Sequence, residues 1–376
     1  MKIGIDAMVT PTLKTGVGRY IDGLLTGLAE SNEENEYVIF SGQNQGDPPV
    51  VNGSRFKICR SSVSTEQSLR NLFWKIAVLP RLIEKEAIDV LHIPNEKPVF
   101  FKGRPTVMTI HDIADFRIRR RCSWPKRLFR RFVLPLTVRN VDHFIAVSQT
   151  TRMDLIELLG VPPARITVIY EAAAPEFRPI DKGEARSIVQ TRWGVSGDII
   201  LFVGEIDVRK NLAALIGAFD LVINRWGLKS TLFIAGKNGR GMDNLTADVR
   251  RRHLGDSVLF AGYVTPEELL ALYNAARMLV LPSLYEGFGL PVLEAMACGT
   301  PVVASRSGSL PEVIGNAGLL VDTTQQGALA EAIATLLTDA EARNKLIEAG
   351  FSRARQFSWA ATAQATVEVY RRVARR

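Results

Sequence analysis

The chain has 376 residues, of which 47% are hydrophobic and 23% charged. This length accommodates two domains with a core each, and the composition is that of an ordinary globular protein, which excludes intrinsic disorder and fibrous repeats. The three cysteines, Cys59, Cys122 and Cys298, lie far apart and form no CxxC pair. They argue against a disulfide framework or a zinc site and favour a reducing compartment.

The N-terminus has the pattern of a short buried strand and lacks the apolar region of a signal peptide. The sequence holds no window of about 18 uncharged apolar residues, so no membrane-spanning helix is expected. These features predict a cytoplasmic protein.

The net charge of +8 is concentrated in the first half, where residues 1–175 hold 24 basic and 18 acidic residues. The segment from Arg117 to Arg131 contains eight basic residues and no acidic one. This clustering indicates a local anionic partner rather than general nucleic-acid binding.

The first half alternates short apolar runs with helical periodicity. The periodicity predicts helices over residues 19–30, 69–86, 126–138 and 149–159. The expected strands are rich in Val and Ile and cover residues 1–9, 36–42, 89–94, 105–112, 143–148 and 165–170. Continuous apolar strands separated by helices are typical of a parallel sheet covered on both faces.

This pattern stops at an Ala/Pro-rich link, residues 171–179, and then starts again. The second series of expected strands covers residues 198–205, 230–236, 257–262, 277–283, 300–305 and 318–322. Two consecutive Rossmann-like, doubly wound α/β domains are the economical interpretation, with ligands at the carboxyl ends of the strands in a cleft between them. We predict domains at 1–174 and 175–357, and a last helix, 358–376, that packs back across their junction.

The most informative motif follows the strand expected to end at Leu281. It contains Glu286-Gly287-Phe288-Gly289-Leu290 and, eight positions after Glu286, Glu294 in the expected first helical turn. A strand, a glycine-containing loop and a helix start aim backbone N–H groups at one point, which suits a diphosphate. The simpler alternative is that both glutamates only interact with the helix dipole. Phe288 is expected to be exposed, without a packing role.

A second motif follows the strand that ends at Gly204, where Arg209 and Lys210 stand side by side. Preorganised cations there would stabilise the charge of a departing nucleoside diphosphate. Both side chains could instead be solvated loop charges. A third motif, Gly16-Val-Gly18, follows the first strand and is either a phosphate loop or a simple turn. His111, which ends another strand, is either catalytic or a structural hydrogen-bonding residue.

These motifs, in this order, resemble the family-4 retaining glycosyltransferases, which have the two-domain GT-B fold. Thr15–Tyr20, Thr109–Asp112, Arg209–Asn211 and Gly308–Glu312 are similar to that family's pattern along most of the chain. The resemblance implies that Glu286 holds the donor sugar, Glu294 the ribose, and His111 the transferred sugar. One position departs from it: Glu205 stands where many members carry Arg, so Arg209 is expected to supply the second cation.

The sequence contains no Asp-x-Asp pair, the usual ligand set of metal-dependent sugar transferases. We therefore expect no cofactor and no metal, with Arg209, Lys210 and backbone N–H groups neutralising the diphosphate.

The basic segment interleaves cations with aromatic residues, which suits an anionic membrane surface. A solvated helix face and binding of single-stranded nucleic acid are alternatives, but no RNA or DNA module accompanies the segment. We predict docking on the inner leaflet of the cytoplasmic membrane, near a saccharide or polyprenyl-diphosphate-linked acceptor. The residues expected to act there are Arg119, Arg120, Arg121, Trp124, Lys126, Arg127, Arg130 and Arg131.

The resemblance implies a retaining, metal-independent hexosyltransferase of polysaccharide biosynthesis, with GDP-mannose as the expected donor. Donors such as UDP-glucose, UDP-N-acetylglucosamine and dTDP-rhamnose stay open, and Ser283 and Glu267 are candidates for reading the base. A nucleotide-sugar 2-epimerase of the same fold and a non-enzymatic membrane-binding module are the competing interpretations.

Overall fold

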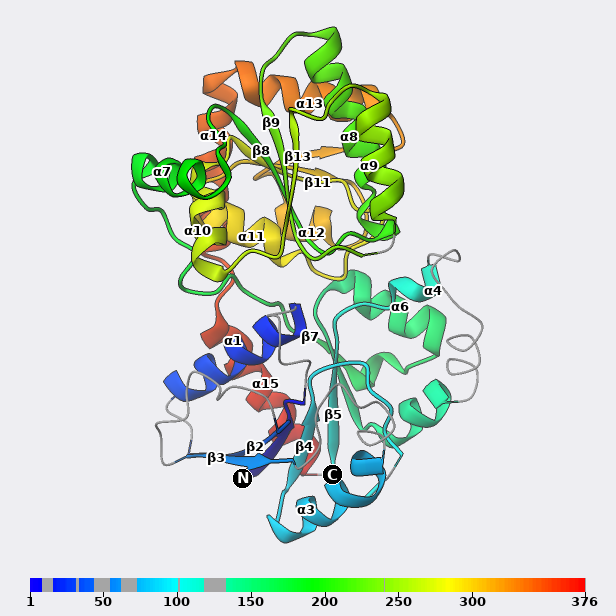
Figure 1. Ribbon diagram of the computed structural model, residues 1–376. Coiled ribbons are helices and arrows are strands. Elements are labelled where there is room, and N and C mark those ends of the chain that lie inside the picture. The colour runs from blue at the N-terminus through cyan, green and yellow to red at the C-terminus, as the bar shows by residue number, and fades with distance from the viewer. Residues whose placement is uncertain are drawn as a thin grey trace. The chain divides into compact units, whose positions relative to one another are not determined.

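A computed structural model of the chain describes residues 1–8, 16–31, 34–43, 55–61, 73–100, 102–117, 133–239 and 241–375. The chain divides into two compact units (Figure 1). The first comprises Met1–Ala172 together with Ser358–Arg376, and the second comprises Ala173–Phe357. Each unit is an α/β structure built on one parallel sheet.

The sheet of the first unit has the order β3-β2-β1-β4-β5-β6-β7. Its strands are β1 (Lys2–Asp6), β2 (Glu36–Ser41), β3 (Phe56–Arg60), β4 (Val90–Ile93), β5 (Thr106–Ile110), β6 (His143–Ala146) and β7 (Ile166–Val168). All neighbouring pairs are parallel, so the carboxyl ends of the strands share one edge. The order reverses between β1 and β4, which is the switch point where ligands bind in sheets of this kind.

Helices flank this sheet on both faces, as in a doubly wound fold (Figure 1). They are α1 (Gly16–Glu30), η1 (Trp74–Val78), α3 (Leu79–Lys85), α4 (Ala114–Arg117), α6 (Gln149–Leu159), η3 (Pro163–Arg165) and α15 (Trp359–Ala374). One hydrophobic cluster of this unit includes Phe40, Trp74 and Phe144 and residues of α3 and α6.

The last helix, α15, packs against α1 and contacts β4, β5 and β6 of the first unit. Close approach is possible because α1 presents glycines at the contact. A Cβ added to Gly23 would lie 2.1 Å from the Trp359 indole, and one added to Gly27 would lie 2.3 Å from the Trp359 carbonyl oxygen. The chain therefore completes its first unit with its final helix.

The sheet of the second unit has the order β10-β9-β8-β11-β12-β13, again parallel throughout. Its strands are β8 (Ile199–Val203), β9 (Thr231–Ala235), β10 (Val258–Gly262), β11 (Met278–Leu281), β12 (Val302–Ser305) and β13 (Leu319–Val321). The order reverses between β8 and β11, so the loops after these two strands meet at the switch point.

The helices of the second unit also lie on both faces of its sheet (Figure 1). They are α7 (Lys182–Trp193), η4 (Val208–Lys210), α8 (Leu212–Asp220), η5 (Leu221–Arg225), α9 (Met242–Arg251), α10 (Pro266–Ala275), α11 (Leu290–Ala297), α12 (Leu310–Ile314), α13 (Gln326–Thr338) and α14 (Ala340–Ala354).

The structure confirms the predicted α/β class with two doubly wound units, and every predicted strand is present. Sequence analysis missed β3, Phe56–Arg60. This strand carries Lys57 and Arg60 among its apolar residues and lies at the edge of its sheet, so it lacks the continuous apolar run of a central strand.

Candidate active site

The loops after β8 and β11 are joined by several hydrogen bonds in the second unit. The Leu284 backbone N–H donates to the Arg209 carbonyl over 2.8 Å, and the Asn211 side-chain amide donates to the Pro282 carbonyl over 3.2 Å. Asp207 caps the intervening 3-10 turn η4 by accepting from the Arg209 N–H. These bonds bring the two predicted motifs into one place.

Glu286 lies at the centre of this arrangement, with three side-chain donors on its carboxylate. Its Oε1 accepts from Lys210 Nζ over 2.6 Å and from Ser283 Oγ over 2.5 Å. Its Oε2 accepts from an Arg209 guanidinium N–H over 2.7 Å, and the same nitrogen donates to the Tyr285 carbonyl. Arg209, Lys210 and Glu286 therefore form one cluster, which is incompatible with their being solvated loop charges.

The cluster is shielded from water, and its electrostatics follow from that. The side chains of Arg209, Lys210 and Glu286 are 14%, 10% and 8% exposed. Burial on its own raises the pKa of Glu286, but the charges of Lys210 and Arg209 and the hydrogen bonds from Lys210 and Ser283 lower it to about 2. Glu286 is thus an anion at any physiological pH and balances two cations.

The backbone around Glu286 is fixed by the segment that follows β12. Ser309 Oγ donates to the carbonyls of Glu286 and Phe288, and the Ser309 N–H also donates to Glu286. Gly308 has a φ of +58°, and a Cβ there would lie 2.4 Å from the Glu286 carbonyl oxygen. Only glycine allows the two loops to approach this closely.

Phe288 contradicts the expectation that it is exposed. It is 4% exposed and packs edge-to-face on Phe357, with ring centroids 6.0 Å apart. The aromatic partner lies 69 positions later in the sequence, so local sequence gave no sign of it. Gly287, Gly289 and Leu290 are also buried, and Gly289 takes a φ of 110° just before α11.

Glu294 also lies elsewhere than expected, because α11 begins at Leu290 and Glu294 falls beyond its first turn. The side chain is 1% exposed, and its Oε2 accepts from the Tyr273 hydroxyl over 2.7 Å. Tyr273, from α10, is itself fully buried. Sequence analysis did not single out this buried phenol, which donates to the Glu294 carboxylate.

Gly204 follows β8 with a φ of 152°, and a Cβ there would lie 3.3 Å from Lys210 Cε. Glu205 follows and is exposed, whereas Lys210 is buried. Ser283, a candidate for reading the base, is fully buried and directs its hydroxyl to Glu286 instead.

The first unit holds the other predicted residues. His111 follows β5, and Gly16 and Gly18 form the first turn of α1. Tyr20, one turn into α1, contacts the His111 ring edge-to-face with centroids 4.8 Å apart. The glycine turn and His111 therefore belong to neighbouring parts of one sheet edge, although they lie about 90 residues apart in the sequence.

The ring nitrogens of His111 have a carboxylate and a backbone carbonyl as partners. Its Nδ1 lies 2.7 Å from Glu171 Oε1, and its Nε2 lies 2.9 Å from the Pro94 carbonyl oxygen. Glu171 is buried and follows β7. Sequence analysis placed Glu171 only at the start of the link, although a carboxylate just after a strand of the same sheet was a usable signal.

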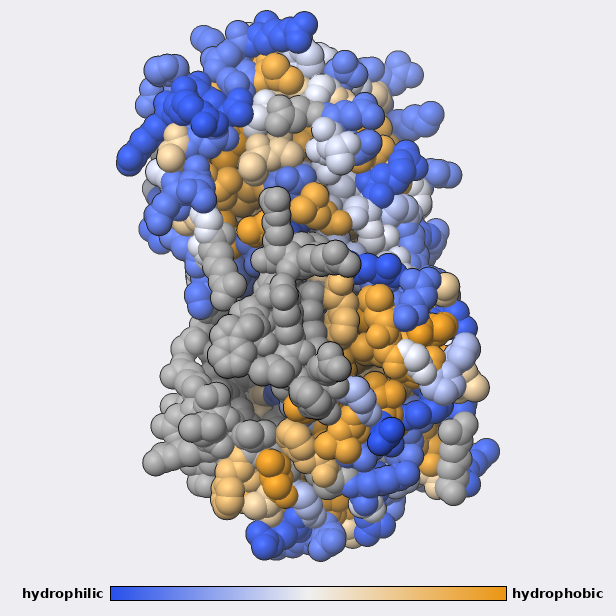
Figure 2. Space-filling view, turned by 90° about the vertical axis from the view of Figure 1, so that its right-hand side faces the viewer, coloured by the Kyte–Doolittle hydropathy of each residue, from blue (hydrophilic) through white to orange (hydrophobic). Residues whose placement is uncertain are grey.

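The predicted membrane and acceptor residues, Arg119 to Arg131, lie outside the described residues. Figure 2 shows hydrophobic side chains gathered on the face of the first unit that bears α4 and α6. Exposed apolar side chains of this unit include Leu136 and Met153, which are 42% and 45% exposed. Among the helices of the described ranges, none has the length and hydropathy needed to cross a bilayer.

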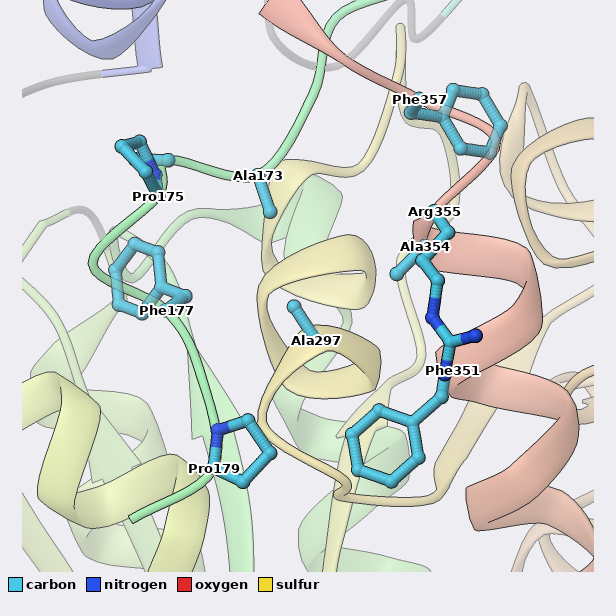
Figure 3. A pocket seen from close by; sticks show the side chains of 10 residues that line it. Ala173, Pro175, Phe177, Pro179, Ala297, Phe351, Ala354, Arg355 and Phe357 are labelled. Carbon is cyan, nitrogen blue, oxygen red and sulfur yellow. The ribbon is translucent and has the colours of Figure 1, made fainter.

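A separate hollow of about 510 Å³ lies in the second unit (Figure 3). It is lined mainly by apolar side chains from the link, α11 and α14, among them Phe177, Ala297 and Phe351, with Arg355 at its border. The predicted donor residues do not line it. The polar cluster and this hollow are distinct features of the unit.

Comparison with known proteins identifies the class. The family model "Glycosyltransferase Family 4" matches residues 14–177, and the model "Glycosyl transferases group 1" matches residues 185–353. The fold matches that of a sucrose-phosphate synthase from Thermosynechococcus elongatus, with a TM-score of 0.78, 23% identity and 99% of both chains covered. The chain has the GT-B fold that sequence analysis predicted.

Two curated relatives also support the assignment to this family. An O-antigen chain mannosyltransferase B of Escherichia coli is 31% identical over 375 residues, which cover 95% of this chain and 96% of that protein. A serotype-specific mannosyltransferase of Escherichia coli is 30% identical over 273 residues, 71% of this chain and 33% of that protein. The chain belongs to the family-4, group 1 glycosyltransferases.

Proposed function

We propose that this glycosyltransferase moves mannose from GDP-mannose to a saccharide or polyprenyl-diphosphate-linked saccharide in polysaccharide assembly. The observation that carries the proposal is the buried cluster of Arg209, Lys210 and Glu286 at the switch point of the second unit. Two cations held beside one carboxylate suit a ligand that is a diphosphate at one end and a polyol at the other.

Each side chain has a role in this scheme. Arg209 and Lys210 neutralise the diphosphate as it leaves, and Glu286 accepts hydrogen bonds from sugar hydroxyls. Gly204 and the segment Gly287–Leu290 line the phosphate and sugar, and Glu294, held by Tyr273, accepts from the ribose. His111, Gly16 and Gly18 belong to the first unit, to which we assign acceptor binding, and the second unit, Ala173–Phe357, binds the donor. We assign Gly16 and Gly18 to donor binding as well, and His111 to the transferred sugar.

The cations make a metal unnecessary in this proposal. Preorganised positive charge lowers the barrier for leaving-group departure by a few kcal/mol for each donor. The acceptor hydroxyl attacks from the face that the diphosphate leaves, a leaving-group oxygen takes its proton, and the anomeric configuration is retained.

The choice of mannose rests on the relatives, two of which are mannosyltransferases by name. UDP-glucose or UDP-N-acetylglucosamine as donor, and a nucleotide-sugar 2-epimerase activity of the same fold, are the alternatives. An epimerase converts the donor without any acceptor, whereas a transferase requires the acceptor.

A polyprenyl-diphosphate-linked acceptor lies in the membrane. We propose that the protein reaches it by attaching peripherally, through the segment 117–131, to anionic lipid on the inner face of the cytoplasmic membrane. Clustered basic residues gain about 1 kcal/mol each near such a surface. Binding to liposomes with and without anionic lipid, before and after replacing Arg119, Arg120 and Arg121 by Ser, tests this. Equal sedimentation of the two proteins would refute it.

The donor and chemistry are tested together. Purified protein is incubated with each nucleotide sugar, a mannose-terminated acceptor and excess EDTA, and the product linkage is determined by NMR. The expected result is an α-linked mannoside formed only from GDP-mannose, at an undiminished rate in EDTA. Loss of turnover in EDTA with recovery on adding Mn²⁺, or product from another donor, would contradict the respective part of the proposal.

A further inference from the structure

Both ring nitrogens of His111 face groups that accept hydrogen bonds. Nε2 lies 2.9 Å from the Pro94 carbonyl oxygen, which can only accept, so Nε2 carries a proton. Nδ1 lies 2.7 Å from Glu171 Oε1, which accepts when the carboxyl is ionised. An imidazole that donates from both nitrogens is an imidazolium cation.

The surroundings of the ring supply further carboxyl groups. Glu96, from the loop after β4, accepts from the His111 N–H over 2.7 Å and from the Asp112 N–H over 3.2 Å. Asp112 is the neighbouring residue, and its Oδ1 accepts from the Ala114 N–H. Three carboxyl groups, Glu96, Asp112 and Glu171, therefore accompany one histidine.

Two further titratable groups near the ring, among the described residues, are uncharged at neutral pH. Tyr20 packs its ring on His111, and its hydroxyl is within 3.0 Å of Thr109 Oγ1. Burial raises the pKa of Tyr20 above its usual range, so it is a neutral phenol. His92 lies beyond Thr109, and burial lowers its pKa to about 3, so it is neutral as well.

We propose that Glu171 is a positioning residue of the transfer reaction, which together with the Pro94 carbonyl fixes His111 as a doubly protonated donor. The inference rests on the proposed function in one respect, namely that His111 meets the sugar or acceptor. With both nitrogens protonated, His111 has no lone pair to take the acceptor's proton. Its two N–H groups are engaged by Glu171 and the Pro94 carbonyl, so His111 acts as a fixed positive charge, and the acceptor's proton goes to the leaving-group oxygen.

The electrostatics agree with the geometry. Burial on its own lowers the pKa of His111, but the hydrogen bond and charge of Glu171, with a smaller effect of Glu96, raise it to about 9. The imidazolium therefore persists across the neutral pH range. A carboxylate that orients a histidine and fixes its protonation state is a well-established device in other enzymes.

The protonation state is measured first, without any donor, on the full chain with ¹³C-labelled histidine. The protein has four histidines, and single His→Gln variants assign their signals. We expect His111 to titrate near pH 9 and Glu171→Gln to lower that midpoint by ~1–3 pH units. Glu176→Gln, which removes an exposed carboxyl five residues later, is the matched control and leaves the midpoint in place.

The second readout is the pH dependence of kcat/KM. The wild-type profile stays flat from pH 6.5 to 8.5, whereas Glu171→Gln loses activity progressively above neutral pH and regains it on acidification. Glu171→Asp, which keeps the charge, restores part of the high-pH activity. A purely structural residue would instead lower activity equally at every pH.

The outcomes separate this inference from the proposed function. Titration of His111 near pH 6.5, or an unchanged midpoint in Glu171→Gln, overturns the inference whatever the donor is. A shifted midpoint with a pH-independent loss of activity also overturns it, because His111 would then not act through its charge. A wild-type protein that turns over no nucleotide sugar refutes the proposed function, while the titration still decides whether Glu171 sets the charge.

Discussion

Lys210 and Glu286 lie 76 positions apart, yet Lys210 Nζ and Glu286 Oε1 are 2.6 Å apart and both side chains are at most 10% exposed. The pair exists because β8 and β11 are neighbours in the sheet and their loops meet. Arg209 completes it from the adjacent position. Glu286 is therefore the counter-anion of both cations that we assign to the diphosphate.

Removing Glu286 is expected to destabilise the fold, because Glu286→Gln leaves two buried cations side by side. The expected loss in the free energy of unfolding is about 3 kcal/mol. The double variant that also carries Lys210→Met should lose less stability than the sum of the losses of the two single variants. The expected difference is about 1 kcal/mol or more. Urea denaturation measures both, with Lys345→Met on the exposed side of α14 as control. Additive losses would show that the pair is not coupled.

The same pair makes stability depend on pH. The pKa of Glu286 is about 2 in the folded protein, below its ordinary value of 4.5. Its contribution is therefore complete above pH 4.5 and is lost as the pH falls toward 2, with a full size of about 3 kcal/mol. The difference in unfolding free energy between wild type and Glu286→Gln should shrink over this range. A difference that is constant between pH 5 and pH 2.5 would contradict it.

Gly308 is expected to tolerate no side chain. Gly308→Ala places a Cβ against the Glu286 carbonyl and strains a positive φ, so we expect a loss of ~2 kcal/mol or more and weaker donor binding. Gly327→Ala is the matched control, since Gly327 lies in α13 with no atom within 4 Å of an added Cβ. It should stabilise by ~0.5–1 kcal/mol. Thermal unfolding and nucleotide titration distinguish the two.

Tyr273 is expected to act on the donor through Glu294. Tyr273→Phe removes the hydroxyl that donates to Glu294 Oε2. The loss of this buried hydrogen bond should lower the free energy of unfolding by about 1–3 kcal/mol. We expect KM for the nucleotide sugar to rise more than kcat falls, because the ribose contact is made before and during transfer. Tyr263→Phe, at a position that is 46% exposed, serves as the control. Equal KM values for the nucleotide sugar in the two variants would show that Tyr273 has no effect on donor binding.

Much of this architecture was predictable from the sequence for a definite reason. Buried parallel strands are continuously apolar, so twelve of the thirteen strands among the described residues were recognisable, and the edge strand Phe56–Arg60 was not. That the loops of Arg209, Lys210 and Glu286 lie close together was also expected, because ligands gather at the carboxyl ends of strands beside the switch point. The ion pairs of both cations with Glu286 were not predicted.

The failures have a common cause as well. Phe288 was expected to be exposed because its partner, Phe357, lies far along the chain. Glu171 was overlooked because its partner, His111, lies 60 positions earlier. A side chain's role that depends on a distant neighbour cannot be recognised from the residues around it. Glu294 differs only slightly from its prediction, because α11 begins at Leu290 as expected and Glu294 lies just beyond its first turn.

The packing of α15 on α1 has a consequence for how this protein is made. Residues 1–172 leave the ribosome without the helix that covers Gly23 and Gly27 and that supplies Tyr370, whose hydroxyl lies 2.6 Å from His92 Nδ1. The amino-terminal unit can reach its native packing only after the last nineteen residues have been synthesised. Translation that stops short of Ser358 yields a polypeptide whose carboxy-terminal unit is whole and whose amino-terminal unit has an uncovered hydrophobic face, a substrate for chaperones and proteases.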